Sequence, residues 1–469
     1  MNHITKFWPL SDIYLDRNSS SLALSSKPLY RLAVEALARN FSNNPRCPKY
    51  RAAVAELPLG TRLDLLAEMC DYPSLVEVQW EILSDPLLVS DFIKYLSADL
   101  TPLVQCLQWL QSVKKPVPFQ LFRQYKKLIE EKKWKDVPVR FDYRCGLRIG
   151  TFLTETGWTM EAIDILQLAH QHARCGTAEE LTVLRQLMRA QTLTGKLINA
   201  MQTYDRMKIL LSGITQQMES SQQLPNNLNE GQSLQDLKVA VFHSFSLYHF
   251  EEQSFDLSYA YGMHSLTSIS ERSPSRLVID VLRQLVRACL GRRMHAKAAF
   301  ILKHAIGLVV QHCGRFSPLY AETLEDLAIL LLVCNHVSES VDVYEEAQQI
   351  YMQRYGSRNL MLSLAQGNLA YGLCLQAYVT GHRDRALQHV EKSIGNYKRI
   401  WPPEHRMLAQ AFRLRATMEL FIYPTRTEEQ NGLLQDESFN HQDIEPLSVG
   451  EITGRIRLIT EWEKRKDTK

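Results

Sequence analysis

The sequence predicts an all-α fold built from repeated pairs of antiparallel helices. Small residues stand at fixed positions in segments that are otherwise rich in leucine: Ser340 follows Ala328 by 12 residues, and Ala347 follows Ser340 by 7. Two helices can approach closely only where the residues at their crossing are small. The third observation is that this spacing recurs along the chain, which indicates one structural unit used several times.

The 12-then-7 spacing marks five further units. They are Gly150, Ala162 and Ala169; Met188, Ala200 and Met207; a weaker unit from Ala240 to Leu266 with Ser258 and Ser265; Val286, Ala298 and Ala305; and Ala370, Ala386 and Ser393, where the first interval is 16. Three consecutive units share a 42-residue period. Helix pairs with such periods are typical of tetratricopeptide repeats, which stack into a superhelix because one pair cannot bury its apolar face alone.

The composition is that of an ordinary globular protein, with 45% hydrophobic residues, 22% charged residues and a formal net charge of +3. This near balance gives no argument for nucleic acid binding. Nine cysteines without a C-x-x-C pair predict buried thiols in a reducing compartment. Neither a signal peptide nor an apolar run of roughly 20 residues is recognisable. We expect a soluble protein of the cytoplasm, with the nucleus as a further compartment and no integral membrane segment.

Two polar stretches interrupt the repeats, and each has few apolar residues to bury. The predicted organisation is an N-terminal extension (1–27), a helical region (28–140), repeats (141–214), a flexible linker (215–235), further repeats (236–420), and an acidic linker with a short helix (421–469).

The sequence contains no phosphate-binding loop, dinucleotide-binding motif or H-E-x-x-H motif. His170, His172 and Cys175 lie close together, but residues two apart on a helix point to different faces, so a structural role is favoured over metal binding. The same applies to His304 and His389. We expect a protein that is not an enzyme and needs no metal or cofactor.

The concave face of the superhelix is predicted to carry mixed charge. In the first helix of each unit, the residues three and six positions before the small residue and one position after it should face this surface. Asn368, near Ala370, adds an amide. The predicted groove residues are Asp280, Arg283, Arg287, Glu322, Glu325 and Asn368. Such a groove can hold a peptide with a basic side chain and a terminal carboxylate. The alternative, that these charges only solvate the inner face, stays open.

Ahead of the repeats, Leu29, Ala33 and Leu37 fall on one stripe of a predicted helix and are expected to bury together. Leu57-Pro58, followed by Leu63, begins a second predicted helix. An ordinary amphipathic helix followed by a proline-initiated one explains either pattern equally well.

The chain resembles the amyloid protein-binding protein 2 family from about Pro28 to Ala416, most clearly in "LVIDVLRQLVRACLGRRMHAKAAFILKHAIGLVVQHCG", "NLAYGLCLQAYVTGHRDRALQHVEKSIG" and "WPPEHRMLAQAFRLRA". Members of that family look like tetratricopeptide substrate receptors of a cullin-RING ubiquitin ligase. They join the ligase through elongin B and elongin C and recognise degrons at substrate C-termini that contain arginine and glycine. Family members usually continue with further repeats, whereas this chain ends in an acidic linker and a short tail, which puts part of the peptide groove in doubt.

The resemblance implies roles for the residues of the head. The elongin-binding residues are Pro28, Leu29, Ala33 (where such boxes often have cysteine) and Leu37; the cullin-binding residues are Leu57, Pro58 and Leu63. The mixed-charge groove would then receive an arginine-bearing degron. The sequence therefore predicts a non-catalytic substrate adaptor with elongin B/C, a cullin scaffold and degron-bearing proteins as partners.

The alternative function is a trafficking scaffold that binds amyloid precursor-like tails and microtubules. It is motivated by the stretch from Lys114 to Arg140, which holds nine Lys/Arg against three Asp/Glu and could meet an acidic surface. A solvated helix face is the favoured interpretation of this stretch.

Overall fold

The computed structural model describes residues 29–96, 100–134, 143–156, 158–220, 234–270, 273–355, 360–380, 384–400, 408–409 and 411–416. Within these residues every regular element is a helix, which confirms the predicted all-α class. Pro28, the 1–27 extension and the 421–469 tail lie outside them. The chain divides into two compact units, residues 5–281 and residues 282–469.

The head of the chain is a group of short helices, several of which begin at a proline. They are α1 (Leu29–Asn43), α2 (Pro48–Glu56), α3 (Leu59–Glu68), the 3-10 turns η2 (Met69–Asp71) and η3 (Pro73–Leu75), α4 (Val76–Leu83), α5 (Pro86–Tyr95), α6 (Thr101–Ser112) and α7 (Val117–Trp134). Helix α3 packs against α1, α5 and α6, so it forms the centre of the head. Proline suits a helix start because the first turn needs no backbone N–H donor.

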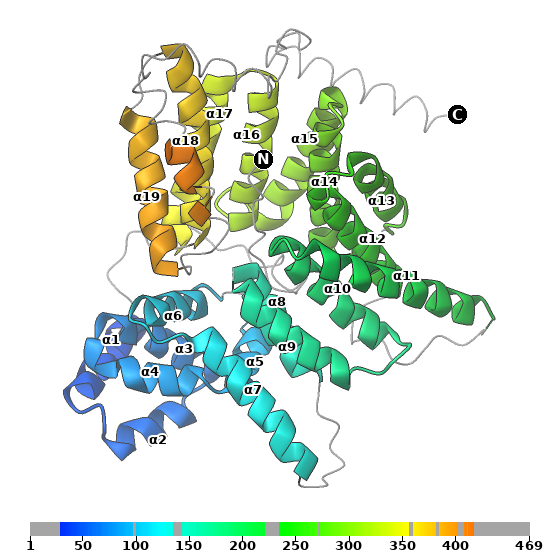
Figure 1. Cartoon of the computed structure of the whole chain (residues 1–469). Helices are drawn as coiled ribbons and strands as arrows, with labels where there is room; N and C mark the ends of the chain where they lie inside the picture. Colours follow the sequence, from blue (N-terminus) through cyan, green and yellow to red (C-terminus); the bar gives the residue numbers. More distant parts are fainter. Residues whose placement is uncertain are drawn as a thin grey trace. The chain divides into compact units, whose positions relative to one another are not determined.

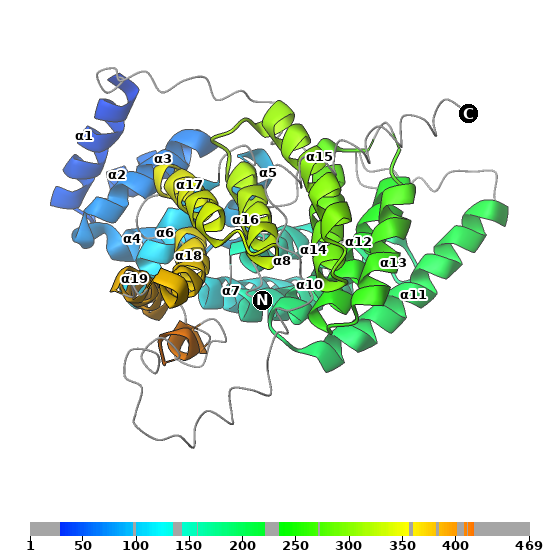
Figure 2. The same ribbon diagram turned by 90° about the horizontal axis from the view of Figure 1, so that it is seen from above.

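Six helix pairs follow. They are α8 (Tyr143–Thr156) with α9 (Thr159–His172), α10 (Ala178–Leu193) with α11 (Leu197–Ser220), α12 (Leu234–Glu251) with α13 (Phe255–Thr267), α14 (Ser275–Gly291) with α15 (His295–Cys313), α16 (Pro318–Val333) with α17 (Val337–Tyr355), and α18 (Leu360–Thr380) with α19 (Asp384–Ile400). Figures 1 and 2 show the two helices of α16–α17 and of α18–α19 side by side. Each pair coincides with one predicted unit, and the described chain is a tetratricopeptide-type solenoid.

Helix α11 differs from the prediction at its end. It continues to Ser220, past Thr215 where a flexible linker was expected to begin. The residues from Thr215 to Ser220 include glutamine, methionine and glutamate, which favour helix, and contain neither glycine nor proline. Polarity alone therefore does not end this helix. In the described part of the chain, no helix is both long and apolar enough to cross a lipid bilayer.

The small residues of the 12-then-7 pattern lie where the helices of a pair meet. In α16–α17, Ala328, Ser340 and Ala347 are all fully buried. The Ser340 hydroxyl donates a hydrogen bond to the Ala328 carbonyl at 2.8 Å, which shows how closely the second helix approaches the backbone of the first. In α12–α13 the hydroxyls of Ser246 and Ser258 each donate to the other residue's carbonyl, at 2.7 and 2.8 Å. Ser246 is the small residue of this weaker unit that the sequence interpretation missed.

The turns within the pairs share one backbone feature. A residue with positive φ follows the small residue of the first helix by seven positions in four pairs: Gly195, Gln253, Arg293 and Asn335, with φ of 73°, 65°, 57° and 63°. In each turn the next N–H reaches back to the helix, as the His336 N–H does to the Leu331 carbonyl at 2.8 Å. This is the Schellman arrangement, which ends a helix by satisfying its free carbonyl groups. Of these four residues only Gly195 is a glycine, the residue type that adopts positive φ without strain.

Gly150 provides a direct test of close helix approach. A Cβ added there would lie 2.5 Å from the Leu166 Cγ on α9. We expect Gly150→Ala to lower the free energy of unfolding by about 1–3 kcal/mol, because the added methyl group overpacks a filled contact.

Urea denaturation followed by circular dichroism measures this effect, and Gly213→Ala in α11 is the matched control. No atom lies within 4 Å of a Cβ at Gly213, so alanine should gain about 0.5–1 kcal/mol there from its helix propensity. Equal effects of the two substitutions would contradict the packing argument.

Candidate functional site

Helix α1 has two apolar faces, and the described residues cover only one of them. Val34, Ala38 and Phe41 are buried against the rest of the head. On the other side Leu29 is 82% exposed and Leu32 is 47% exposed. These two leucines leave apolar side-chain surface of α1 in solvent.

The predicted stripe of Leu29, Ala33 and Leu37 lies on this outer face. Ala33 is exposed and Leu37 is half-buried. The expectation that the three residues bury together within the chain is wrong, because α1 packs through the neighbouring stripe that contains Val34 and Ala38. The structure therefore leaves the outer stripe accessible to a partner.

Polar contacts hold α1 in place at both ends. The Tyr30 hydroxyl donates to the Asp64 carboxylate on α3 at 2.6 Å. At the other end the Ser74 hydroxyl donates to the Ser42 carbonyl at 3.1 Å. Burial, followed by the bond to Asp64, raises the pKa of Tyr30, so this hydroxyl keeps its proton as the donor. The outer face of α1 is thus presented by a helix whose position is fixed.

Leu57 and Pro58 form the connection between α2 and α3. Pro58 is exposed at the N-cap of α3, and Leu57 is half-buried. The Arg62 guanidinium donates to the Leu57 carbonyl at 3.1 Å and also bonds the Ala55 carbonyl, which fixes the connection. Leu63 is only 2% exposed and belongs to the core of the head. Its predicted cullin-binding role stays a prediction, and in this conformation the side chain lies on the inward face of α3.

The basic stretch falls on α7 and on residues 135–140, which lie outside the described part of the chain. Arg123, Lys126 and Lys127 are exposed on α7. Lys127 pairs with Glu131 at 3.6 Å. Lys115, just before the helix, pairs with Glu77 at 2.6 Å. Part of this charge is therefore paired locally, as on a solvated helix face.

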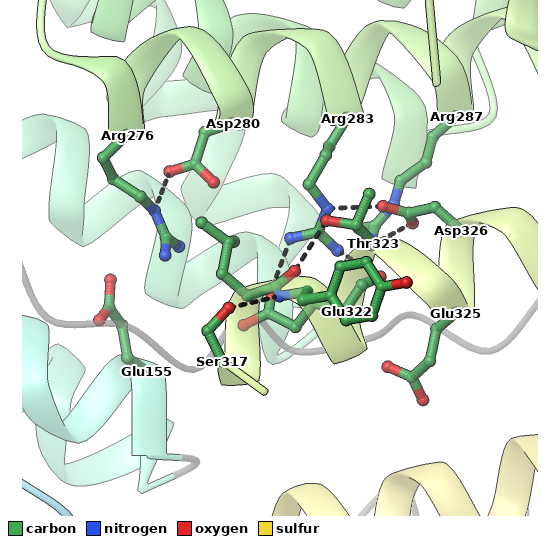
Figure 3. Close-up of polar contacts among 12 residues, drawn as sticks. Glu155, Arg276, Asp280, Arg283, Arg287, Ser317, Glu322, Thr323, Glu325 and Asp326 are labelled. Atoms are coloured by element: carbon green, nitrogen blue, oxygen red, sulfur yellow. Dashed lines mark hydrogen bonds and ion pairs between the residues drawn. The ribbon is translucent and has the colours of Figure 1, made fainter. Parts of the chain in front are cut away.

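A buried ion network connects the first helices of two neighbouring repeats, α14 and α16 (Figure 3). The Arg283 side chain is 0% exposed. Its Nη1 donates to Glu322 Oε2 at 2.5 Å, its Nε donates to Asp326 Oδ2 at 2.6 Å, and its Nη2 donates to the Glu322 carbonyl at 2.9 Å. Arg287 Nε donates to the other oxygen of Asp326 at 2.9 Å. Burial raises the pKa of Asp326, but the two guanidiniums outweigh it and hold that pKa below its usual value.

Glu325 lies beside this network and has different partners. It accepts hydrogen bonds from Asn368 Nδ2 at 3.1 Å and from the Tyr351 hydroxyl at 3.2 Å. Its pKa is raised to about 8, mainly by burial and also by the neighbouring carboxylates of Glu322 and Asp326, while the bonds from Asn368 and Tyr351 oppose the rise. Glu325 is therefore mostly protonated at neutral pH, whereas Asp326 is ionised.

The structure thus brings together most of the predicted groove residues, but it buries their side chains instead of exposing them to solvent. Arg283, Glu322 and Glu325 are fully or almost fully buried, and Asn368 is buried as well. The prediction that these side chains line an accessible groove is wrong for this conformation, because opposite charges one repeat apart satisfy one another. Asp280 is half-buried and accepts from Arg276 Nε at 3.1 Å.

Sequence reasoning missed two members of this polar interior. Asp326 follows Glu322 by four residues, one helical turn, so the pair could have been recognised as sharing a face. In the other unit Arg189 donates to the buried Glu155 at 2.9 Å, and Arg189 stands one residue after Met188, at the position that the groove rule assigns. Burial raises the pKa of Glu155 to about 7, against the opposing charge of Arg189.

His170 contacts a buried carboxylate. Its Nε2 lies 3.3 Å from the buried carboxylate of Glu180. The same carboxylate accepts from the Gly176 N–H at 2.6 Å and from Arg206 Nη2 at 2.9 Å. Burial opposes ionisation of Glu180, but these donors lower its pKa. Across the residues that the structure describes, no three His, Cys, Asp or Glu side chains are grouped to hold a metal ion.

Comparison with known proteins gives partial matches. The chain is 31% identical over 201 residues to amyloid protein-binding protein 2 of Rattus norvegicus, which covers 42% of this chain and 34% of that protein, and the Mus musculus protein matches over the same shares. The chain thus spans about a third of the length of the curated relatives it matches. No family model matches the chain.

Solved structures match at low similarity. A Podosopora anserina putative kinesin light chain with tetratricopeptide-like repeats gives a TM-score of 0.33 at 13% identity, covering 46% of this chain and 98% of that chain. The Cut9–Hcn1 hetero-tetramer of APC/C gives 0.41 at 12% identity, covering 83% and 73%. Over the matched 201 residues, this tetratricopeptide-type protein is similar to amyloid protein-binding protein 2.

Proposed function

We propose that the protein is a non-catalytic adaptor of a cullin-RING ubiquitin ligase. The outer face of α1 docks elongin C in its complex with elongin B, and the Leu57-Pro58 connection contacts the cullin. The repeats hold the protein to be modified, and other subunits transfer ubiquitin. This function needs no metal or cofactor.

The observation that carries the proposal is the uncovered apolar stripe of α1. Leu29, Ala33 and Leu37 are spaced four residues apart, which is how a helix presents anchors to an apolar groove on a partner. The small Ala33 between two leucines lets the partner approach the helix closely. The partial similarity to amyloid protein-binding protein 2 supports the choice of partner, because the head motifs resemble the elongin-binding pattern of that family.

Co-purification with elongin B/C tests the docking surface. We expect Leu29→Asp and Ala33→Asp each to weaken elongin binding by roughly 30-fold or more, because a charge enters the centre of an apolar contact. Both side chains are exposed in the free chain, so the fold should be retained.

Leu87→Asp is the matched control for this experiment. Leu87 is an exposed leucine on α5 of the same head, and its substitution should leave elongin binding unchanged. If the unaltered chain never retains elongin B/C, or if all three variants bind equally well, the adaptor proposal fails.

The peptide-binding part of the proposal requires the buried charges to rearrange. Because Arg283 is fully paired with Glu322 and Asp326, a peptide that uses these groups must first replace those ion pairs. A library of C-terminal peptides screened against the elongin-bound chain tests this role. Enrichment of arginine-bearing termini would support it, and enrichment of no terminus would remove it.

A second candidate function is a trafficking scaffold that contacts an acidic surface such as a microtubule. The observation that favours it is the exposed group of Arg123, Lys126 and Lys127 on α7. Contacts of this kind weaken as salt rises. Co-sedimentation with microtubules should therefore fall in high salt and in a Lys126→Glu, Lys127→Glu variant, and binding that ignores both changes would eliminate this candidate.

A further inference from the structure

Two cysteine thiols face each other in the core of the head. Cys70 lies in η2, directly after α3, and Cys106 lies in α6. Their Sγ atoms are 4.0 Å apart and both residues are free cysteines. Cys106 is fully buried, whereas Cys70 is partly exposed, so Cys70 is the residue of the pair that lies closer to solvent.

A buried amide is aimed at the accessible sulfur. Gln79 on α4 is fully buried, and its Nε2 lies 3.4 Å from Cys70 Sγ and 2.6 Å from the Leu66 carbonyl. The second bond orients the amide so that its N–H group points at the sulfur. A donor in this position stabilises the thiolate form, which is the reactive form of cysteine.

The pKa values of the two thiols shift in opposite directions, which agrees with this geometry. The bond from Cys106, and then that from Gln79, lower the pKa of Cys70 despite its burial. The pKa of Cys106 is raised, because its proton is shared with Cys70 and because it is buried. Burial alone acts differently, as at Cys289, where it raises the pKa to about 11. Cys70 is thus suited to react first and Cys106 to hold its proton.

We propose that Cys70 and Cys106 form a reversible oxidation site, at which a small hydroperoxide converts the two thiols into a disulfide. In the first step the Cys70 thiolate attacks one peroxide oxygen, the O–O bond breaks, and Cys70 becomes a sulfenic acid while hydroxide or an alkoxide leaves. In the second step the Cys106 sulfur attacks the sulfenic sulfur, and an S–S bond forms. The sulfenic hydroxyl takes the Cys106 proton and leaves as water.

The geometry requires only a local movement. A disulfide has an S–S distance of about 2.05 Å, so the sulfurs must approach by about 2 Å from their present separation. The cross-link would join α6 to the end of α3 and close the chain between residues 70 and 106. Such a link restricts the unfolded chain and stabilises the fold. Oxidation should therefore raise the melting temperature of the head, and thiol reductants should reverse the change.

The test is peptide mapping of the full chain after treatment with hydrogen peroxide, with iodoacetamide blocking the remaining thiols. We expect a Cys70–Cys106 cross-linked peptide that disappears on reduction with dithiothreitol. In a Cys106→Ala variant the resolving thiol is absent, so Cys70 should accumulate as the sulfenic acid and react with dimedone at least about 10-fold more than in the unaltered chain. Gln79→Leu should slow the oxidation of Cys70, because the amide donor is lost.

Cys175→Ser is the matched control. Cys175 is exposed and lies on the α9–α10 connection, so its loss should leave the cross-link unchanged. The wild-type map depends on no variant and decides the question even if Cys106→Ala fails to fold. The proposal is overturned if the peroxide-treated chain contains no Cys70–Cys106 peptide, or if Cys70 stays reduced while Cys175 is oxidised.

Discussion

Replacing Arg283 with alanine is expected to lower the free energy of unfolding of the repeats by about 3–5 kcal/mol, because it leaves the buried Glu322 carboxylate without its counter-charge and Asp326 with one of its two. Arg283 is fully buried and bonds both Glu322 and Asp326. Both carboxylates are fully buried. Arg287 still pairs with Asp326 in the variant, so the larger part of the loss should arise at Glu322.

Urea denaturation measures the loss, paired with hydrogen exchange of α16 because the two units can unfold in separate transitions. Arg385→Ala is the control: Arg385 pairs with Glu345 in an exposed position, and such pairs contribute up to about 1 kcal/mol. A variant that combines Arg283→Met with Glu322→Gln should recover most of the loss, since it removes the unpaired charge and leaves Asp326 paired with Arg287. A loss for Arg283→Ala no larger than that for Arg385→Ala would contradict the network.

Glu325→Gln is expected to stabilise the protein at pH 8 and to have little effect at pH 5. The pKa of Glu325 is raised from 4.5 to about 8 in the folded chain, so the folded state keeps a proton that the unfolded state releases. Its contribution is fully present below the unfolded pKa and is lost as pH rises toward 8. Across this window the wild type should lose about 1.4 kcal/mol per pH unit from this one group. Glutamine has no proton to lose.

The measurement is the free energy of unfolding of both proteins from pH 5 to pH 8. The difference between them isolates Glu325, because other groups titrate identically in both, including Glu155, whose pKa is raised to about 7, and His389, whose pKa is lowered by burial. Glutamine keeps one amide oxygen for the bond from Asn368, and its NH2 group can donate to the Tyr351 hydroxyl oxygen, as the protonated carboxyl group can. A pH-independent difference would show that Glu325 ionises normally in the fold.

The helix pairs could be predicted from the sequence because their packing is local. Ala328 and Ser340 are 12 residues apart and meet across one turn, so one unit contains all the information. The positive φ at Gln253, Arg293 and Asn335 follows the same register, but nothing in these side chains except asparagine favours that conformation. The position of the turn could be predicted from the sequence, but its backbone conformation could not.

The site was predicted less well, because burial depends on neighbouring units. Arg283 was predicted to line an open groove, but it is buried and its partners lie a full repeat away on α16. No rule within one unit shows that those charges will pair. The prediction that Leu29, Ala33 and Leu37 bury together was wrong for a related reason. The sequence of α1 shows two apolar stripes, one with Val34 and one with Leu29, and only the fold shows that the head covers the stripe with Val34.

Hydrogen–deuterium exchange of the chain with and without elongin B/C tests the docking claim most directly. We predict that α1 (Leu29–Asn43) becomes protected in the complex, because a partner covers its outer face and suppresses local opening. Exchange within α16 and α17 should stay unchanged. Protection confined to the repeats, or an α1 that exchanges equally in both samples, would contradict the account.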